Sequence, residues 1–223
     1  MTTRRAGLVP FGLSTLTMAL VVLSAPSAHA ALLFSEDFSG AVPSANYGLG
    51  TISGTQFRVT TNAVDIAGHL NGSFFTCTNN PSGNCVDLVG SPGVGAIASV
   101  PTFTLIAGDT YTITFDYILQ GFNPNASATS HFRVGLGSFS DDLTAIPTVQ
   151  HASLNFTPSA NQNGVTLSFA TLTEPDTVHG AVIDHIALNE TPVSAVPEPS
   201  TLLLLGTGLV GMGRAMWRGR RRT

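Results

Sequence analysis

A strict two-residue alternation between residues 111 and 118 is the strongest constraint on the fold of this chain. Aromatic and aliphatic side chains occupy every second position there, namely Tyr111, Ile113, Phe115 and Tyr117. Side chains of a β-strand alternate between its two faces, so the run predicts a strand that buries one face. No helical periodicity occurs between residues 31 and 190, so the core is expected to lie between β-sheets.

Shorter alternating runs predict further strands at residues 57–61, 85–89, 131–136, 165–169 and 182–188. In the last run, one face is expected to carry Val182, Asp184, Ile186 and Leu188. Additional strands are expected at 74–76, 96–100, 103–106 and 149–156, with a short turn at 141–146. About eight to ten short strands, separated by segments rich in Gly, Asn and Pro, indicate an all-β fold with a two-sheet sandwich.

The N-terminus has the pattern of a signal peptide. Arg4 and Arg5 precede an apolar stretch over residues 7–25, and Ala28-His29-Ala30 forms an A-x-A cleavage pattern. This order predicts a signal peptide at 1–30 and a mature domain that starts at Ala31. A retained N-terminal anchor is the alternative, and Pro26 beside the small residues argues against it.

The C-terminus combines a proline motif, an apolar run and a basic end. Residues 191–200 form a linker that contains Pro197-Glu198-Pro199, and residues 201–213 carry no charge. Continued through residue 217, the run would form a helix of roughly 25 Å, close to the roughly 30 Å hydrocarbon core of a bilayer. We therefore expect a transmembrane helix at 201–217 and a basic cytoplasmic tail at 218–223. A marginal tail anchor or a buried helix is the alternative.

These three C-terminal parts, in this order, closely resemble the PEP-CTERM sorting signal of Gram-negative bacteria. The resemblance implies that an exosortase, a membrane cysteine protease-transpeptidase, processes the tail near Pro197, Glu198 and Pro199. Signal peptidase and exosortase are then the partners during export. The membrane helix is a transient anchor, and the mature product is expected at the cell surface or in the extracellular matrix.

The two cysteines of the chain, Cys77 and Cys85, are expected to form a disulfide. Export permits disulfides, and the residues between the two cysteines are rich in turn formers that can close the loop. The bond should stabilise the fold by roughly 2–3 kcal/mol. Free thiols or a metal site are the alternatives, although two cysteines without a nearby histidine pair make a poor zinc site.

The middle of the chain is acidic. Between Ala31 and Glu190, two arginines stand against twelve acidic residues, which gives a formal charge of −10 with neutral histidines. Such a domain repels phosphate backbones, so nucleic acid is not expected as a partner. The charge is compatible with divalent cations and with neutral sugars.

The order of the predicted strands brings a second resemblance. Glu36-Asp37-Phe38 near the start, residues 103–115 in the middle and Ile183-Asp184-His185-Ile186 at the end look like the galactose-binding-like jelly roll of many carbohydrate-binding modules. The resemblance covers nearly all of residues 31–190. It implies that the first and last strands lie close together, where many members hold a structural calcium ion.

Glu36, Asp37 and Asp184 are the calcium candidates, and no other cofactor is expected. Calcium takes six to eight oxygen ligands, and these carboxylates would converge if the ends of the domain meet. His185 follows Asp184 where the family commonly has Asp or Asn, which weakens the assignment. The alternative is that Asp184 caps a buried strand end while Glu36 and Asp37 are solvated.

No pattern of catalytic residues stands out, so the protein is not expected to be an enzyme. The histidines are scattered without an H-E-x-x-H pair, and the chain has no G-x-S-x-G elbow or P-loop. Asp141 and Asp142 are adjacent, and adjacent strand residues point to opposite faces rather than to one substrate. Both are expected in a solvated loop.

The sequence therefore predicts an exported β-sandwich protein with a structural or adhesive role at the cell surface or in the matrix. The alternative is a carbohydrate-binding module that recognises matrix exopolysaccharide. The sequence assigns no ligand-binding residue to either function.

Overall fold

The alternating segments form β-strands in the computed structural model, which describes residues 29–68, 77, 83–91, 93–119, 128–173 and 179–193 together with Gly208. Seventeen strands lie within these residues. All described residues except Gly208 belong to one compact unit. The run over 111–118 forms the centre of a ten-residue strand in which buried and half-buried positions alternate without interruption.

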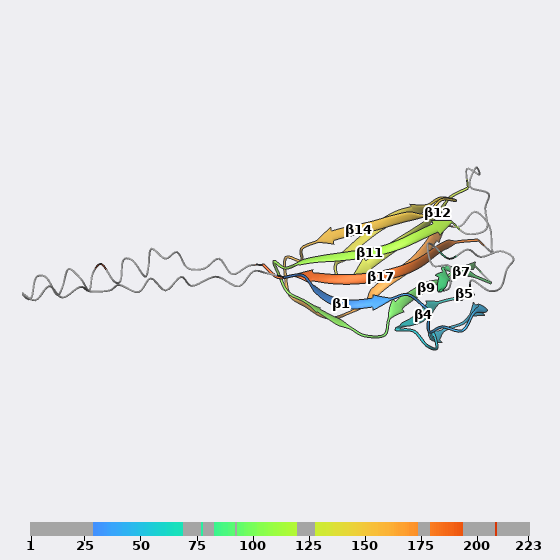
Figure 1. Cartoon of the computed structure of the whole chain (residues 1–223), viewed down its shortest axis with the longest axis horizontal. Coiled ribbons are helices and arrows are strands. Elements are labelled where there is room, and N and C mark those ends of the chain that lie inside the picture. The colour runs from blue at the N-terminus through green and yellow to red at the C-terminus, as the bar shows by residue number, and fades with distance from the viewer. Residues whose placement is uncertain are drawn as a thin grey trace, which may run out of the picture. The chain divides into compact units, whose positions relative to one another are not determined.

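Seven strands form the first sheet, and the last strand of the domain lies near its middle. The order is β14 (Gln150–Phe156), β11 (Thr110–Leu119), β17 (Ala181–Thr191), β6 (Asn84–Asp87), β5 (Val64–Gly68) and β2 (Ser44–Tyr47). The seventh strand, β1 (Ala31–Glu36), pairs with the second half of β17, while β6 pairs with the first half. Figure 1 shows β14, β11, β17 and β1 side by side in this layer. The first and last strands are therefore neighbours, as the second resemblance implies.

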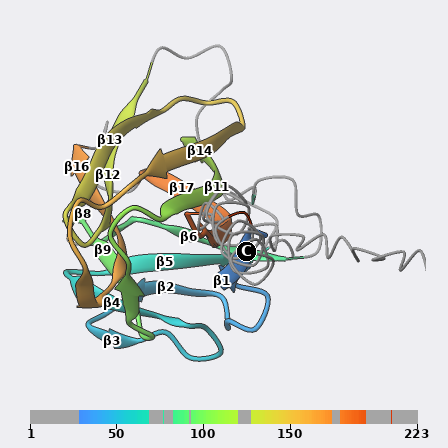
Figure 2. The same ribbon diagram turned by 90° about the vertical axis from the view of Figure 1, so that its left-hand side faces the viewer.

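Six strands form the opposing sheet. Their order is β13 (Phe139–Ala145), β12 (Ser130–Leu136), β16 (Leu167–Thr173), β9 (Ala96–Ser99), β4 (Phe57–Thr61) and β3 (Gly50–Thr51). Two small ribbons complete the unit, β10 (Phe103–Leu105) with β15 (Gln162–Val165) and β7 (Val89–Gly90) with β8 (Gly93–Val94). In Figure 2 the strands β13, β12, β16 and β9 form one layer beside β14, β11 and β17. The predicted fold class, an all-β two-sheet jelly-roll sandwich, is confirmed.

Aromatic rings fill the space between the two sheets. Phe115 of the first sheet packs edge-on against Phe169 of the second, with ring centroids 5.1 Å apart and an interplanar angle of 83°. Phe169 also contacts Phe57 at 6.1 Å, and all three rings are fully buried. Edge-to-face pairs of this kind add to the energy gained by burying apolar surface. The inward side chains of the alternating runs thus form a single core.

A β-bulge interrupts β17 and changes the faces of its side chains. The register passes from Asp116 opposite Asp184 to Thr114 opposite Ala187, so two residues of β17, His185 and Ile186, oppose the single residue Phe115. His185 has a φ of 50°, in the left-handed region. An extra residue of this kind reverses the alternation beyond it.

The prediction of one shared face at the end of the chain is therefore wrong. Ile186 and Leu188 lie in the aromatic core, but Val182 belongs to a separate cluster and Asp184 pairs across from Asp116 on the outer face. Ile183 takes the inward position instead. The reason is the bulge, which inserts one residue between the two halves of the strand.

A disulfide joins Cys77 and Cys85, whose Cα atoms are 5.5 Å apart, as predicted. Val86 is part of the main core, so its neighbour Cys85 faces the other side of the first sheet. There the two cysteines pack with Ala67, Val182 and Ile118 in a second, smaller cluster. The bond thus supports apolar packing on the outer face of a sheet whose inner face already carries the main core.

Other predictions are corrected or fall outside the described residues. The turn expected at 141–146 is wrong, because residues 139–145 form the edge strand β13 paired with β12. The strand expected at 74–76, the signal peptide and the tail from residue 194 lie outside the described residues, apart from Gly208 and the two residues before Ala31. Among the residues that the structure describes, no helix has the length and apolar character needed to span a membrane.

Candidate functional site

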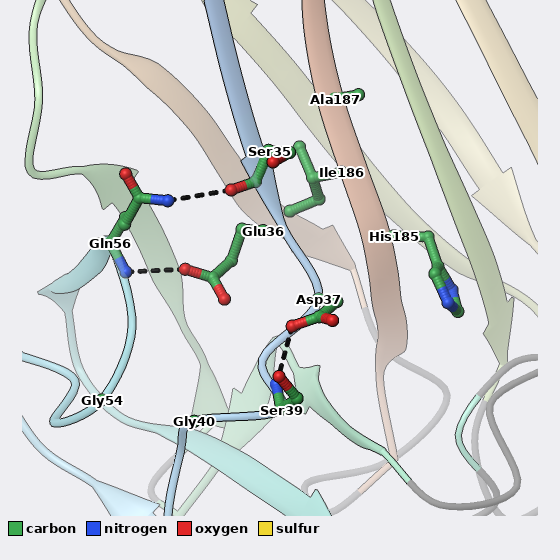
Figure 3. Close-up of a pocket in the computed structure, with 10 residues that line it drawn as sticks. All are labelled: Ser35, Glu36, Asp37, Ser39, Gly40, Gly54, Gln56, His185, Ile186 and Ala187. Carbon is green, nitrogen blue, oxygen red and sulfur yellow. Dashed lines mark hydrogen bonds between the residues drawn. The ribbon is translucent and has the colours of Figure 1, made fainter.

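A polar pocket of about 540 Å³ opens where the first and last strands meet. Its wall consists of the end of β1, the turn that follows, a glycine turn near Gly54 and the bulged part of β17. Figure 3 shows Glu36, Asp37 and Ser39 on the β1 side, with Gln56 beside them and His185 across β17. None of the ten described residues that line the pocket is Phe, Tyr or Trp.

Glu36 connects two segments of the pocket wall through hydrogen bonds. Its side chain is buried, and Oε1 accepts a hydrogen bond from the Phe38 amide at 2.8 Å while Oε2 accepts one from the Gln56 amide at 2.7 Å. The Gln56 side-chain amide donates in turn to the Ser35 carbonyl at 2.8 Å, as Figure 3 shows. Glu36 therefore serves as a bridge between β1 and the 54–56 segment, with both carboxylate oxygens occupied.

Two glycines make this wall possible. The backbones of Gly40 and Gly54 approach so closely that a Cβ atom on either would collide with the carbonyl oxygen of the other. Gly54 also has a φ of +79°, a conformation that favours glycine. The position of the turn against β1, and with it the shape of the pocket, depends on this absence of side chains.

Asp37 supplies the exposed charge of the pocket. Its Oδ1 accepts a hydrogen bond from the Ser39 amide at 3.0 Å. The hydroxyl and amide of Ser39 lower the pKa of Asp37 below its ordinary value, so this carboxylate is ionised at neutral pH. An ionised acceptor beside serine hydroxyls and His185 suits a ligand with hydroxyl groups or positive charge.

Asp184 precedes His185 in β17 and is fully buried beside the bulge. Its Oδ1 accepts a hydrogen bond from the His185 amide at 2.8 Å, whereas Oδ2 has no hydrogen-bond partner within the described part of the chain. Burial raises the pKa of Asp184 to about 7, and the nearby charges of Asp37 and Asp116 act in the same direction. His185 opposes the shift.

Three observations bear on the predicted calcium set. Among the described residues, no three His, Cys, Asp or Glu side chains are grouped so that they could hold a metal ion. Both oxygens of Glu36 already bind backbone amides, and Asp184 is buried with a raised pKa. Asp37 and Asp184 are close enough for their charges to interact, but calcium at Glu36, Asp37 and Asp184 stays a prediction.

Asp141 and Asp142 are exposed on strand β13, not in a loop as expected. The Arg133 guanidinium donates two hydrogen bonds to Asp142, at 2.6 and 2.8 Å, so this carboxylate belongs to a surface ion pair. The sequence analysis missed a different group, in which Asp116 lies between His151 and His185. Only strand pairing brings these residues together, and no local motif marks them.

Comparison with protein families identifies one match, to the PEP-CTERM protein-sorting motif, at residues 195–222. This range contains Pro197, Glu198 and Pro199, as predicted. No curated protein matches the chain significantly.

Solved structures with similar folds share little sequence with the chain. An arabinose-bound MgGH51 α-L-arabinofuranosidase is 14% identical, with a TM-score of 0.48 over 71% of this chain and 27% of the enzyme. The CBM22-1-GH10 modules of Clostridium thermocellum xylanase 10B are 12% identical, with a TM-score of 0.43 over 78% and 31%. The CBM22-1 xylan-binding domain of Paenibacillus barcinonensis Xyn10C is 9% identical, with a TM-score of 0.42 over 76% and 99%.

The chain spans about a third or less of the first two of these structures. The family match lies in residues 195–222, outside the β-sandwich. The tail therefore says more about the destination of the protein than the fold does. The PEP-CTERM motif implies processing by an exosortase. The chain is thus an exported protein that its PEP-CTERM motif directs to the cell surface.

Proposed function

We propose that the mature domain, residues 31–190, is a structural or adhesive component of the cell surface or extracellular matrix and not an enzyme. The observation that carries this proposal is the sorting motif at residues 195–222. Signal peptidase would remove residues 1–30. The helix at 201–217 would hold the chain in the inner membrane of a Gram-negative bacterium until the exosortase cuts near Pro197-Glu198-Pro199.

The build of the sandwich supports a role outside the cell. A disulfide between Cys77 and Cys85 reinforces the outer cluster, and aromatic rings fill the core. The formal negative charge of the domain, with twelve acidic residues against two arginines between residues 31 and 190, opposes aggregation between copies and binding of nucleic acid. These are properties that suit a stable surface component.

Fractionation of the full chain in its host, with and without the exosortase, tests this proposal. We expect the mature protein at the surface or in the matrix of normal cells and an uncut, membrane-bound form without the enzyme. Replacement of Pro197, Glu198 and Pro199 by alanine should reproduce the uncut form. Val193→Ala, an exposed change before the motif, is the control and should be processed normally. Equal distribution in all strains would overturn the proposal.

A second candidate function is recognition of matrix polysaccharide at the pocket. The observation that favours it is the polar lining, where the ionised Asp37 lies beside Ser39, Gln56 and His185. Sugar hydroxyls donate well to carboxylates and accept from amides. The pocket has no aromatic platform among its described lining, so hydrogen bonds would have to supply most of the affinity.

Polysaccharide pull-down with the exported protein separates the two functions. Saturable binding that Asp37→Asn weakens at least tenfold would favour recognition at the pocket, because a hydrogen bond to a charged group contributes about 1.5–3 kcal/mol. Asp141→Asn, an exposed change on the opposite sheet, is the matched control. If no polysaccharide binds saturably, the second function fails and the structural role stands.

A further inference from the structure

Four segments meet at the end of the sandwich where the last strand stops. We call them the Thr191 end, and they comprise residues 29–32, 106–110, 157–164 and 189–193. Ala31 of β1 pairs with Glu190 of β17, and the start of β11 pairs with the same stretch of β17 from its other side. The Gly108 amide donates a hydrogen bond to the Pro158 carbonyl at 3.0 Å. Figure 1 shows β14 and β17 running toward this end and β1 starting from it.

The two carboxylates of the Thr191 end are both engaged with groups of the domain itself. Asp109 is buried, and its Oδ1 accepts a hydrogen bond from the Val193 amide at 2.7 Å. Glu190 is half-buried, and its Oε1 accepts one from the Tyr111 hydroxyl at 2.6 Å. The four segments contain no other acidic residue and no arginine or lysine. This end of an otherwise acidic domain therefore presents little charge to its surroundings.

Apolar side chains are exposed at the same end. Leu32, Ile106 and Val193 are 61%, 48% and 67% exposed. They come from three different segments of the Thr191 end, so the feature does not belong to a single loop. Single exposed apolar residues are common on protein surfaces. The distinctive feature here is their combination with carboxylates that are engaged inside the domain.

The length of the chain beyond Val193 limits how far this end can lie from a membrane. Seven residues, 194–200, separate Val193 from the apolar run that begins at Thr201. An extended chain covers at most about 3.5 Å per residue, so the connection from Val193 to Thr201 spans at most about 28 Å. The hydrogen bond to Asp109 attaches the start of this connection to the domain. With the apolar run in a bilayer, the Thr191 end is the part of the domain held closest to the lipid.

We propose that the Thr191 end rests on the outer surface of the inner membrane until the tail is cut, with Leu32, Ile106 and Val193 among the phospholipid headgroups. This inference rests on the proposed function, because it requires the tail to be a membrane anchor. Apolar side chains gain free energy in the interfacial region of a bilayer. Anionic headgroups repel exposed carboxylates, and this end presents few. The tether keeps the effective concentration high, so a weak contact is sufficient to orient the domain.

Quenching of tryptophan fluorescence by brominated phospholipids tests the contact. The uncut protein is purified from cells that lack the exosortase and is reconstituted in vesicles of phosphatidylethanolamine and phosphatidylglycerol. Trp217, the only tryptophan of the chain, is first removed by Trp217→Phe. Ile106→Trp or Val193→Trp then supplies a single reporter at the Thr191 end. Each reporter should lose most of its emission in brominated vesicles relative to unbrominated ones, because bromine quenches only at short range.

Val149→Trp is the matched control at the opposite end of the sheet. Val149 is apolar and 44% exposed, similar to Ile106. The residue after it, Gln150, pairs with Tyr117, whereas the other end of β14 pairs with Tyr111. Six residues of extended strand separate these two positions of β11, which corresponds to about 20 Å. The emission of this variant should be the same in both kinds of vesicle.

A charged variant separates a specific contact from mere proximity to the membrane. With Leu32→Trp as the reporter, Ile106→Glu and Val193→Glu together should abolish the quenching, because anionic lipid repels the added carboxylates. Val149→Glu, which adds charge at the opposite end, should leave the quenching of the same reporter unchanged. Circular dichroism verifies the fold of each variant. Val193→Trp, at the most exposed of the three positions, serves if another reporter disturbs the fold.

The outcomes distinguish this inference from the function on which it rests. Protein that floats with the vesicles while Ile106→Trp and Val193→Trp are quenched no more than Val149→Trp overturns the contact and leaves the anchor intact. Quenching that persists in the doubly charged variant also overturns it. Uncut protein that does not float with the vesicles at all overturns the membrane anchor, and the inference fails with it.

Discussion

The two faces of the seven-stranded sheet show how one set of strands serves two purposes. On the inner face, β11 contributes Tyr111, Ile113 and Phe115 to an aromatic core that is closed to solvent. On the outer face, the same strand carries Asp116 between two histidines. The inner face depends on volume and shape, whereas the outer face combines a small apolar cluster around the disulfide with a group of charged side chains around Asp116. Substitutions on the two faces should therefore change the stability of the protein in different ways.

The largest expected effect is on the inner face. Phe169→Ala removes a fully buried ring that contacts Phe57 and Phe115, and it should lower the free energy of unfolding by about 3–5 kcal/mol. Leu172→Ala on the same strand is the control, because Leu172 is 40% exposed and should cost far less. Urea denaturation at neutral pH measures both. Equal losses would show that the aromatic layer is not the main source of stability.

The next effect concerns the apolar cluster of the outer face. Replacement of Cys77 and Cys85 by serine opens the disulfide, which should lower the free energy of unfolding by roughly 2–3 kcal/mol. The same loss should follow reduction of the natural protein by dithiothreitol, and the serine variant should not respond to the reductant. A variant as stable as the natural protein would contradict the assignment of this bond as a structural clamp.

The charged part of the outer face should respond to pH. The pKa of Asp184 rises from 3.8 to about 7 on folding, so the native state binds a proton that the unfolded chain releases. Stability should therefore fall as the pH rises from about 4 to about 7. Asp184→Asn should remove this contribution, and its advantage over the natural protein should grow across the same interval, measured by urea denaturation with a chelator present.

Asp37→Asn is the control for this pH dependence, because the pKa of Asp37 is lowered instead. Its carboxylate stabilises the fold above its unfolded pKa and loses that contribution as the pH falls. The variant should therefore be slightly less stable than the natural protein at neutral pH. A common pH profile for both variants would mean that burial of Asp184 does not control its protonation.

The smallest effect is expected at the exposed ion pair of the second sheet. Arg133 and Asp142 are both about half exposed, and surface pairs of this kind contribute little. Arg133→Gln should leave the midpoint of urea denaturation within experimental error. A clear loss of stability would show that the bidentate hydrogen bonds between Arg133 and Asp142 contribute measurably to the free energy of unfolding.

Much of the sandwich could be predicted because apolar side chains at every second position indicate which side of a strand is buried. This signal identified the strands around Phe57, Phe115, Phe132 and Phe169. It failed for short or polar strands such as β3 and β13, where few apolar side chains mark a face. The disulfide was predictable because its loop is local and rich in turn formers.

The candidate sites were harder to predict because they depend on strand pairing. Asp116 and His151 are separated by 35 positions and meet only through the register of β11 and β14. The bulge at His185 adds one residue to β17 and follows from no local pattern. Without it, Asp184 would be assigned to the face of Leu188. Glu36 was identified as important from its place near the first strand, but its hydrogen bonds to backbone amides follow only from the turn geometry.

The central position of β17 has a mechanical consequence. This strand is held along one edge by β11 and along the other by β6 and β1. Tension applied at Thr191, the end of the strand nearest the sorting motif, would load hydrogen-bond ladders on both sides at once. An edge strand would instead peel away one bond at a time. A domain tethered through this end would therefore lose its last strand less readily than one whose last strand lies at the edge of a sheet.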